Sequence, residues 1–211
     1  MRVLIVGSGG REHALVKAVK NSPLLEKLVC APGNGGISRD CETVNVSAED
    51  VDGIVKLAKG GNFNLVISGP EVPLSMGLAD KLRAEGIAVY GPNKDGATLE
   101  ASKAFSKDFL KKYNIPTAKG ENFTDANSAE DYIKNAPFDV VIKASGLAAG
   151  KGVIIPSTRE EAVEAARKML EGGLLGESGK EIVVEEKMEG EESSIMLMVC
   201  GTDYIMRPAS Q

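Results

Sequence analysis

The 211-residue sequence contains no tryptophan, three cysteines, one histidine and no apolar run long enough to span a bilayer. Cys30, Cys41 and Cys200 lack the spacing of a metal site, and without a secretory leader they suit reduced thiols in the cytoplasm. Because His13 supports no Ser-His-Asp arrangement, we expect it to be structural. The sequence also lacks an excess of basic residues. Its net charge of -5 argues against nucleic acid or an anionic membrane as a partner.

Glycine, in contrast, is abundant, with 24 residues gathered in short clusters that mark tight loops. In the first half of the chain, apolar runs alternate with helical patterns. The runs lie at 3–6, 27–33, 42–46, 64–69 and 87–91, and the helical patterns lie at 14–19, 50–59 and 74–85. This alternation predicts an α/β fold with a mostly parallel sheet, in a Rossmann-like domain over about residues 1–101.

The second half, residues 102–211, has a different pattern. We expect helices at 103–113, 128–135 and 158–170, the second of them capped by Asn127 or Ser128. Strands are expected at 139–144, 152–156 and 181–188, followed by a hairpin around residues 201–202. This order predicts an α+β domain. Its last strands have no helix to cover them, so we expect either a longer protein or another chain to do so.

A glycine-rich loop, GSGGREHAL, follows the first run and opens a helix. Bare amides at a helix start attract anions. The dinucleotide fingerprint needs glycine where this loop has Glu12, and an acid where the second strand ends in Cys-Ala-Pro. A nicotinamide dinucleotide is therefore disfavoured. The loop is either a tight turn or a site for a phosphate-bearing substrate, with Arg11 beside it.

The loop SGPEVPLSMG follows a later strand and carries Glu71 between two stiffening prolines. The carboxyl ends of parallel strands form the ligand edge of such a sheet. Glu71 could accept hydrogen bonds from sugar hydroxyls or an amine there. The alternative is an exposed loop acid.

Residues 141–156 read VIKASGLAAGKGVIIP, which places Lys143 inside an apolar strand. Burying a lysine without a partner is costly, and a polyphosphate would supply that partner. Gly146–Gly152 offers backbone amides and Lys151 a second cation, as in a flap over nucleotide phosphates. The Walker A order is missing, and an ordinary turn with surface lysines is the alternative.

A further stretch, VVEEKMEGEESS, takes an apolar strand into Glu185 and Glu186. The end of this strand could offer backbone groups to an adenine edge, with Met188 as a soft apolar surface. Glu191 or Glu192 could bind ribose hydroxyls. A solvated charged face is the alternative.

The segments GSGGREHAL, GNGG, GPEVPL, SK-F-K-F, VIKASGLAAGKGV and VEEKMEGEESS occur in this order. In combination they resemble the phosphoribosylamine–glycine ligase family of the ATP-grasp superfamily, over the whole chain. The resemblance implies ligation of glycine to 5-phosphoribosylamine with ATP and Mg²⁺ or Mn²⁺, through a glycyl phosphate, in purine synthesis. The implied architecture is a Rossmann-like domain at 1–101 and an incomplete ATP-grasp domain at 102–211, with a lid at about 118–183.

The resemblance also implies which residues bind the substrates. The implied phosphoribosylamine-binding residues are Gly9, Gly10, Arg11, Glu12 and Glu71. The implied ATP-binding residues are Lys103, Lys143, Gly146, Gly150, Lys151, Gly152, Glu185, Glu186, Met188 and Glu192. The family usually has aspartate at the position of Ser145, so no role is assigned to that side chain. The metal ligands and the glycine site are expected beyond Gln211.

The expected partners are small molecules only, for a full-length enzyme that is a cytoplasmic monomer. The 211-residue chain by itself is expected to be inactive. One alternative is another ATP-grasp ligase such as a carboxylase, which the GREH and GPEVP loops disfavour. A second is a non-catalytic nucleotide-binding fragment. A dehydrogenase is the third, and Glu12 and Ala31 stand against it.

Overall fold

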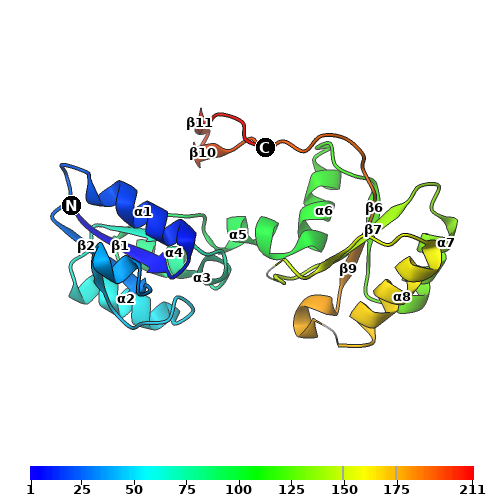
Figure 1. Ribbon diagram of the computed structural model, residues 1–211, viewed down its shortest axis with the longest axis horizontal. Helices are drawn as coiled ribbons and strands as arrows, with labels where there is room; N and C mark the ends of the chain where they lie inside the picture. The colour runs from blue at the N-terminus through cyan, green and yellow to red at the C-terminus, as the bar shows by residue number, and fades with distance from the viewer. Residues whose placement is uncertain (149, 174) are drawn as a thin grey trace.

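Two lobes and a separate hairpin make up the protein, as seen in a computed structural model that describes residues 1–148, 150–173 and 175–211. Helix α5 (Lys94–Ala101) connects the lobes, and the C-terminal hairpin lies apart from both (Figure 1). Among the described residues, no helix has the length and apolar character needed to cross a bilayer.

The first lobe contains a five-stranded parallel sheet in the order β3-β2-β1-β4-β5. Its strands are β1 (Arg2–Gly7), β2 (Lys27–Pro32), β3 (Glu42–Thr43), β4 (Leu65–Ser68) and β5 (Ala88–Tyr90). Its helices are α1 (Gly10–Lys20), the 3-10 turn η1 (Ile37–Arg39), α2 (Val51–Gly60), α3 (Val72–Ser75) and α4 (Leu78–Ala84). The predicted parallel sheet is confirmed.

Both faces of this sheet are buried, which explains the unbroken apolar strands. On β1, Leu4 and Val6 pack with residues of α2 and α4, while Val3 and Ile5 pack with Val16 of α1. Successive side chains of a strand point to opposite faces, so a strand covered on both sides shows no polar alternation. The helix expected at 74–85 is divided, because Gly77 adopts a left-handed φ of 89° between α3 and α4.

The second lobe contains a four-stranded antiparallel sheet in the order β6-β9-β7-β8. Its strands are β6 (Gly120–Phe123), β7 (Val140–Ala144), β8 (Val153–Ile154) and β9 (Ile182–Glu186), and its helices are α6 (Lys103–Lys112), α7 (Ala126–Asn135), α8 (Arg159–Leu170) and the 3-10 turn η2 (Gly176–Gly179). Ile142 and Val184 face the core formed with α7 and α8. Their neighbours Lys143 and Glu185 therefore project from the opposite face, where α6 lies.

Three features differ from the sequence-based expectation. Helix α5 and strand β6 were not predicted, because neither KDGATLEA nor GENF has an apolar period. Helix α7 begins earlier than expected, and its cap is Asp125, whose carboxylate accepts a hydrogen bond from the Ser128 amide at 2.7 Å. The expected cap at Asn127 or Ser128 is therefore wrong.

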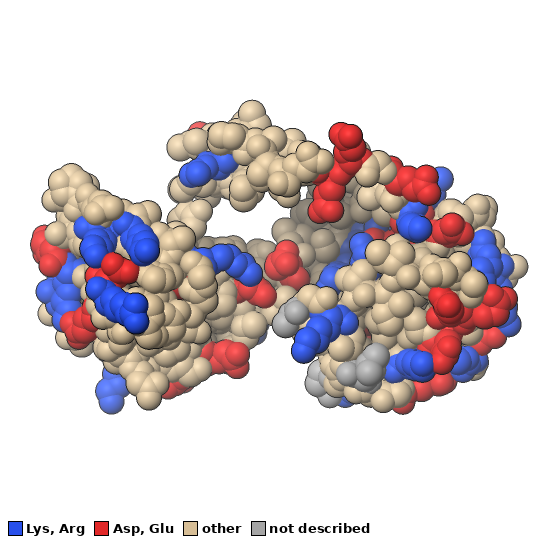
Figure 2. Space-filling model, in the orientation of Figure 1, with Lys and Arg blue, Asp and Glu red and all other residues tan. Residues whose placement is uncertain are grey.

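The hairpin of β10 (Leu197–Cys200) and β11 (Asp203–Met206) is confirmed around residues 201–202. In the described part of the chain these strands pair only with each other, and their residues are exposed. Acidic and basic side chains are interspersed over both lobes, whereas the hairpin surface is mostly uncharged (Figure 2).

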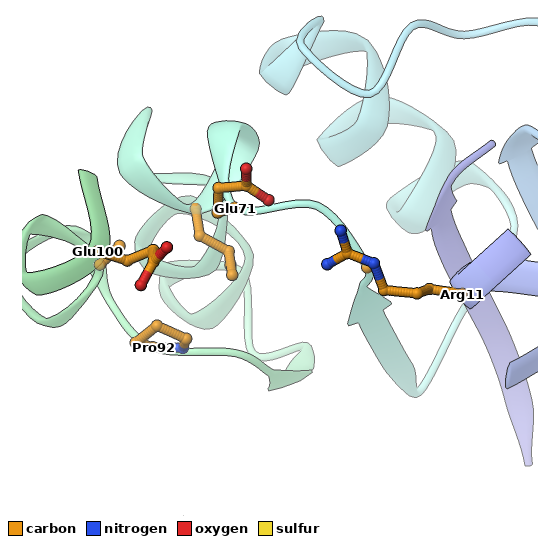
Figure 3. Close-up of a pocket in the computed structure, with 7 residues that line it drawn as sticks. Arg11, Glu71, Pro92 and Glu100 are labelled. Carbon is orange, nitrogen blue, oxygen red and sulfur yellow. The ribbon is translucent and has the colours of Figure 1, made fainter. Parts of the chain in front are cut away.

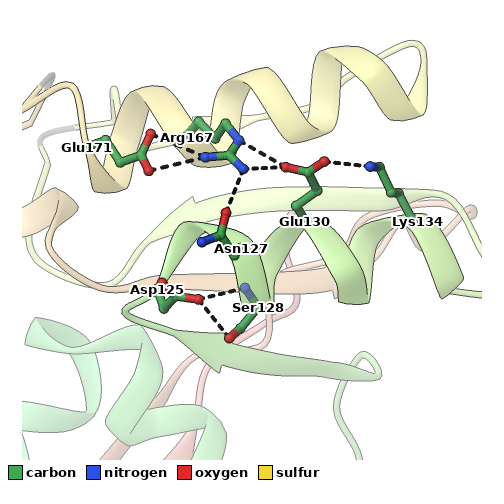
Figure 4. A network of polar contacts seen from close by, with 7 residues as sticks. All are labelled: Asp125, Asn127, Ser128, Glu130, Lys134, Arg167 and Glu171. Atoms are coloured by element: carbon green, nitrogen blue, oxygen red, sulfur yellow. Dashed lines mark hydrogen bonds and ion pairs between the residues drawn. The ribbon is translucent and has the colours of Figure 1, made fainter.

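Helices α7 and α8 are joined by a polar network (Figure 4). Arg167 donates to Glu130 at 2.6 and 2.9 Å and to Asn127 at 2.8 Å, and Lys134 donates to Glu130 at 2.5 Å. These hydrogen bonds, that of Lys134 first and that of Arg167 second, hold the pKa of Glu130 below its ordinary value. The ion pairs with Glu130 therefore contribute to the stability of the helix pair only while Glu130 is ionised.

We expect the free energy of unfolding to fall as the pH falls below about 4.5, the ordinary pKa of Glu130. The sign follows from the lowered pKa, since the unfolded state takes up this proton at a higher pH than the folded state. Glu130→Gln should lower stability at neutral pH and make this acid dependence less steep. Urea unfolding at several pH values measures both, and an unchanged slope in the variant would contradict the assignment.

Candidate functional site

A cavity of about 290 Å³ opens in the first lobe where the α1 start, the loop after β4 and helix α5 converge. Its lining consists of Arg11, Gly69, Glu71, Leu74, Pro92, Ala97 and Glu100. The structure therefore brings together two of the sequence-based candidates, Arg11 and Glu71, from segments that lie far apart in the chain.

Charge is separated across this first cavity. Arg11 projects from one side, whereas Glu71 and Glu100 lie on the other (Figure 3). Guanidinium groups bind phosphates with paired hydrogen bonds, and carboxylates accept hydrogen bonds from hydroxyls or ammonium groups. The cavity thus suits a ligand that is anionic at one end and carries hydroxyl or amino groups at the other.

Glu12 has a different position from that of Arg11. Its side chain is buried, its Oε2 accepts a hydrogen bond from the Gly9 amide at 2.5 Å, and it is absent from the cavity lining. Glu12 therefore stabilises the loop that presents Gly9 and Gly10. A Cβ on Gly10 would meet nothing within 4 Å, so the start of α1 remains open to an approaching group.

We expect Gly69→Ala to destabilise the protein by about 1–3 kcal/mol, because an added methyl group overpacks this loop. A Cβ on Gly69 would lie 2.0 Å from Glu12 Oε1 and 2.5 Å from Glu12 Cγ, so the buried carboxylate would have to leave the Gly9 amide. Gly10→Ala is the matched control, with an expected change within about 0.5 kcal/mol. Equal losses in urea unfolding would show that Glu12 does not set the shape of this loop.

A second cavity, also of about 290 Å³, lies between α5, α6 and the β7–β9 face of the second lobe. Its lining consists of Leu99, Glu100, Lys103, Ser106, Lys107, Leu110, Thr117, Lys143, Val153 and Glu185. Glu100 belongs to both linings, so the two cavities adjoin at the end of α5. Of the expected ATP-binding residues, Lys103, Lys143 and Glu185 meet here.

Three charged side chains of the second cavity are joined by ion pairs. Lys143 donates to Glu185 Oε2, and Lys107 Nζ lies 2.7 Å from Glu185 Oε1. Burial by itself would raise the pKa of Glu185. The hydrogen bonds from Lys107 and Lys143 outweigh that effect, and the pKa lies below its ordinary value. Glu185 is thus an ionised partner for both lysines.

Ser145 joins the start of α6 to the end of β7. The residue is buried, its Oγ accepts a hydrogen bond from the Ala104 amide at 3.2 Å, and it lies 3.2 Å from Ser102 Oγ. Its carbonyl oxygen accepts from the Lys103 amide at 2.8 Å, and Lys103 Nζ donates to the Gly146 carbonyl at 3.3 Å. Ser145 therefore has a structural role, because its hydrogen bonds position Lys103 beside the glycine-rich segment.

Glycine is required at different positions of the 146–152 segment for different structural reasons. A Cβ on Gly146 would lie 2.8 Å from Ser178, and one on Gly152 would lie 2.7 Å from the Ala148 Cβ. Gly150 has a positive φ of 81° with open space around it, and residue 149 lies outside the described part. Lys151 is exposed and is not part of the second cavity lining.

The remaining expected ATP-binding residues follow β9. Glu186 accepts a hydrogen bond from the Lys119 amide at 2.9 Å, which ties it to the segment before β6. Met188 is 71% exposed, and Glu192 is also exposed. None of the three lines either of the two cavities.

Two charged residues of these cavities, Lys107 and Glu100, were not among the sequence-based candidates. Lys107 stands four residues after Lys103, a spacing that places both on one face of a helix, so the signal was present. Glu100 lies in the last turn of α5, a helix that was not predicted, so its position had no sequence signal.

The contacts of the single histidine, His13, and the burial of Cys30 indicate structural roles for both residues. His13 Nε2 lies 2.7 Å from Asp40 Oδ2. Hydrogen bonds from Lys20 and then from His13 lower the pKa of Asp40 to about 2. Burial is the main reason that the pKa of Cys30 rises to about 12, so its thiol is not a nucleophile at neutral pH.

Among the described residues, no three histidine, cysteine, aspartate or glutamate side chains form a group that could hold a metal ion. Glu71 and Glu100 line the first cavity opposite Arg11, and Glu185 is engaged by two lysines.

Comparison with known proteins places both lobes in one family. Residues 1–100 match the N domain of phosphoribosylglycinamide synthetase, and residues 101–211 match its ATP-grasp (A) domain. The phosphoribosylamine–glycine ligase of Haemophilus influenzae is 46% identical over 213 residues, which cover 100% of this chain and 50% of the relative. The chain thus spans about half the length of the curated relatives it matches.

Solved structures agree. Phosphoribosylamine–glycine ligase from Thermotoga maritima superimposes with a TM-score of 0.82 at 31% identity, covering 99% of this chain and 49% of that one. N5-carboxyaminoimidazole ribonucleotide synthetase from the same organism has a TM-score of 0.72 at 21% identity, covering 99% of this chain and 52% of that one. The predicted fold class, a parallel α/β sheet followed by part of an ATP-grasp domain, is confirmed.

Proposed function

The chain belongs to the phosphoribosylamine–glycine ligase family, and on that premise we propose that it forms the amine-binding and nucleotide-binding part of an ATP-dependent ligase. The full-length protein joins glycine to 5-phosphoribosylamine and yields glycinamide ribonucleotide, ADP and phosphate, in purine synthesis. Residues 1–101 bind the amine, and residues 102–211 bind ATP, with a lid at about 118–183. The free thiols suit the cytoplasm as the compartment.

One observation carries the proposal, namely that a charge-separated cavity adjoins a lysine-lined cavity at Glu100. A phosphorylated aminosugar has an anionic end for Arg11 and hydroxyl and amino groups for Glu71 and Glu100. A nucleotide triphosphate suits Lys103 and Lys143. The shared residue lies where the reacting ends of the two ligands would meet.

The proposed chemistry explains why two adjoining sites are needed. A carboxylate is a poor acyl donor, so a glycine carboxylate oxygen first attacks the γ-phosphorus of ATP, and ADP leaves. The ribosylamine nitrogen then attacks the acyl carbon of glycyl phosphate, the C–N bond forms, and phosphate leaves. The residues of this chain hold the reactants together and neutralise phosphate charge, which is how proteins accelerate phosphoryl transfer.

Glycine-dependent ADP release by the full-length protein tests the function. We expect ADP to form only when ATP, glycine and 5-phosphoribosylamine are all present, with one glycinamide ribonucleotide formed for each ADP. Bicarbonate in place of glycine distinguishes a carboxylase of the same fold. ADP release that depends on bicarbonate and ignores glycine would overturn the proposal.

A further inference from the structure

Three charged side chains form a row from the interior of the second lobe to its cavity. Lys107 of α6 contacts Glu185 of β9, and Glu185 contacts Lys143 of β7. The exposed fraction of the side chain increases along the row, from 2% for Lys107 to 13% for Glu185 and 32% for Lys143. Lys143 is therefore the member that a ligand can most readily reach.

Lys107 has no donor left for a ligand. A lysine ammonium carries three N–H donors. Lys107 Nζ lies 3.0 Å from Thr117 Oγ1, 2.7 Å from the Ala118 carbonyl oxygen and 2.7 Å from Glu185 Oε1. Its effect on a bound nucleotide must therefore act through Glu185.

The balance of charge in this row matters for phosphate binding. Two lysines and one glutamate leave one positive charge in excess. Without Lys107, Glu185 and Lys143 would form a neutral pair. If Lys143 then moved to a phosphate, the Glu185 carboxylate would be left without a partner. Leaving a buried carboxylate unpaired is strongly unfavourable. With Lys107 in place, Glu185 keeps a partner when Lys143 moves.

We propose that Lys107 is a positioning residue that holds Glu185, so that Lys143 is free to transfer from Glu185 to the phosphates of the nucleotide. This inference rests on the proposed function of the second cavity as the ATP site. It assigns a role to a lysine that does not itself touch the ligand.

A merely structural role for Lys107 makes a different prediction. If Lys107 only ties α6 to the segment at 117–118, its loss should weaken the binding of adenosine and of ATP by the same factor. If Lys107 acts through Lys143, the loss should grow with the number of phosphates and should depend on Glu185.

The test is calorimetric titration of the full-length protein with adenosine, AMP and ATP. We expect Lys107→Met to weaken ATP binding about fivefold, the scale of one charge-assisted contact reduced by solvent, and adenosine binding less than about twofold. In a Glu185→Gln background, Lys107→Met should change ATP affinity less than about twofold, because no carboxylate is then left for Lys107 to hold. Lys111→Met is the matched control, since Lys111 lies on the same helix and pairs with Glu121 at 2.7 Å on the surface.

Each outcome has one meaning. Equal losses for adenosine and ATP, or a loss of ATP affinity in the Glu185→Gln background as large as in the unmodified protein, would overturn the role of Lys107. If the unmodified protein binds no ATP, the proposed function fails first. If Lys107→Met does not fold, Lys107→Arg carries the test, because arginine keeps the charge and should retain ATP affinity within about threefold; a larger loss in a folded Lys107→Arg protein would also overturn the role.

Discussion

Lys143→Met is expected to weaken ATP binding by the full-length protein at least about tenfold, the value of a lost charge-assisted hydrogen bond of roughly 1.5–3 kcal/mol. Lys143 is the partly exposed end of the charged row in the second cavity, and its only recorded partner in the described chain is Glu185. A nucleotide phosphate would take the place of that carboxylate. Calorimetric titration with ATP measures the change.

Lys151→Met is the matched control for this substitution. Lys151 is a second lysine of the same segment, yet it is exposed and outside the cavity lining. Its loss should change ATP affinity less than about twofold, as expected for a solvated charge. If Lys151→Met weakened ATP binding as much as Lys143→Met, or if neither substitution changed ATP affinity, the assignment of the phosphates to this cavity would be wrong.

Arg11→Met is expected to raise the KM for 5-phosphoribosylamine about 10- to 100-fold while the affinity for ATP stays unchanged. Arg11 is the only cation in the lining of the first cavity, so no neighbouring charge there can replace it at the phosphate. Glu71→Ala should also raise the KM for 5-phosphoribosylamine, because Glu71 lies on the other side of the cavity and its hydrogen bonds to hydroxyl or amino groups would be lost.

The control is Arg39→Met, which removes an exposed arginine of the same lobe that lies outside the lining. Steady-state kinetics with each substrate varied in turn separates the two sites. A selective loss of ATP affinity in Arg11→Met or Glu71→Ala would contradict the division of substrates between the cavities.

The architecture could be predicted for the elements whose burial produces a recognisable apolar pattern in the sequence. Strands β1, β2 and β4 contain unbroken apolar runs because helices cover both faces of the sheet, and that pattern predicted parallel pairing. Strand β6 was not predictable in the same way. It is an edge strand with one buried residue, Gly120, so its side chains show no periodic pattern.

The sequence indicated which kinds of residue form the candidate site better than it indicated how those residues are arranged in space. Lys143 was identified because an isolated lysine in an apolar strand needs a partner, and the structure supplies Glu185. Lys151 looked equivalent in sequence, but whether a hairpin lysine points into a cavity depends on tertiary packing. Glu12 is predicted from the sequence to bind the substrate, and in the structure its carboxylate accepts a hydrogen bond from the Gly9 amide. The meeting of both cavities at Glu100 depends on α5, which shows no amphipathic pattern.

The most direct test of this account is a crystal structure of the full-length protein with a non-hydrolysable ATP analogue. We expect the phosphate chain to lie in the second cavity, with Lys143 Nζ moved from Glu185 to a phosphate oxygen and Lys107 still bonded to Glu185. A phosphate chain bound elsewhere, with the Lys143–Glu185 pair intact, would contradict it.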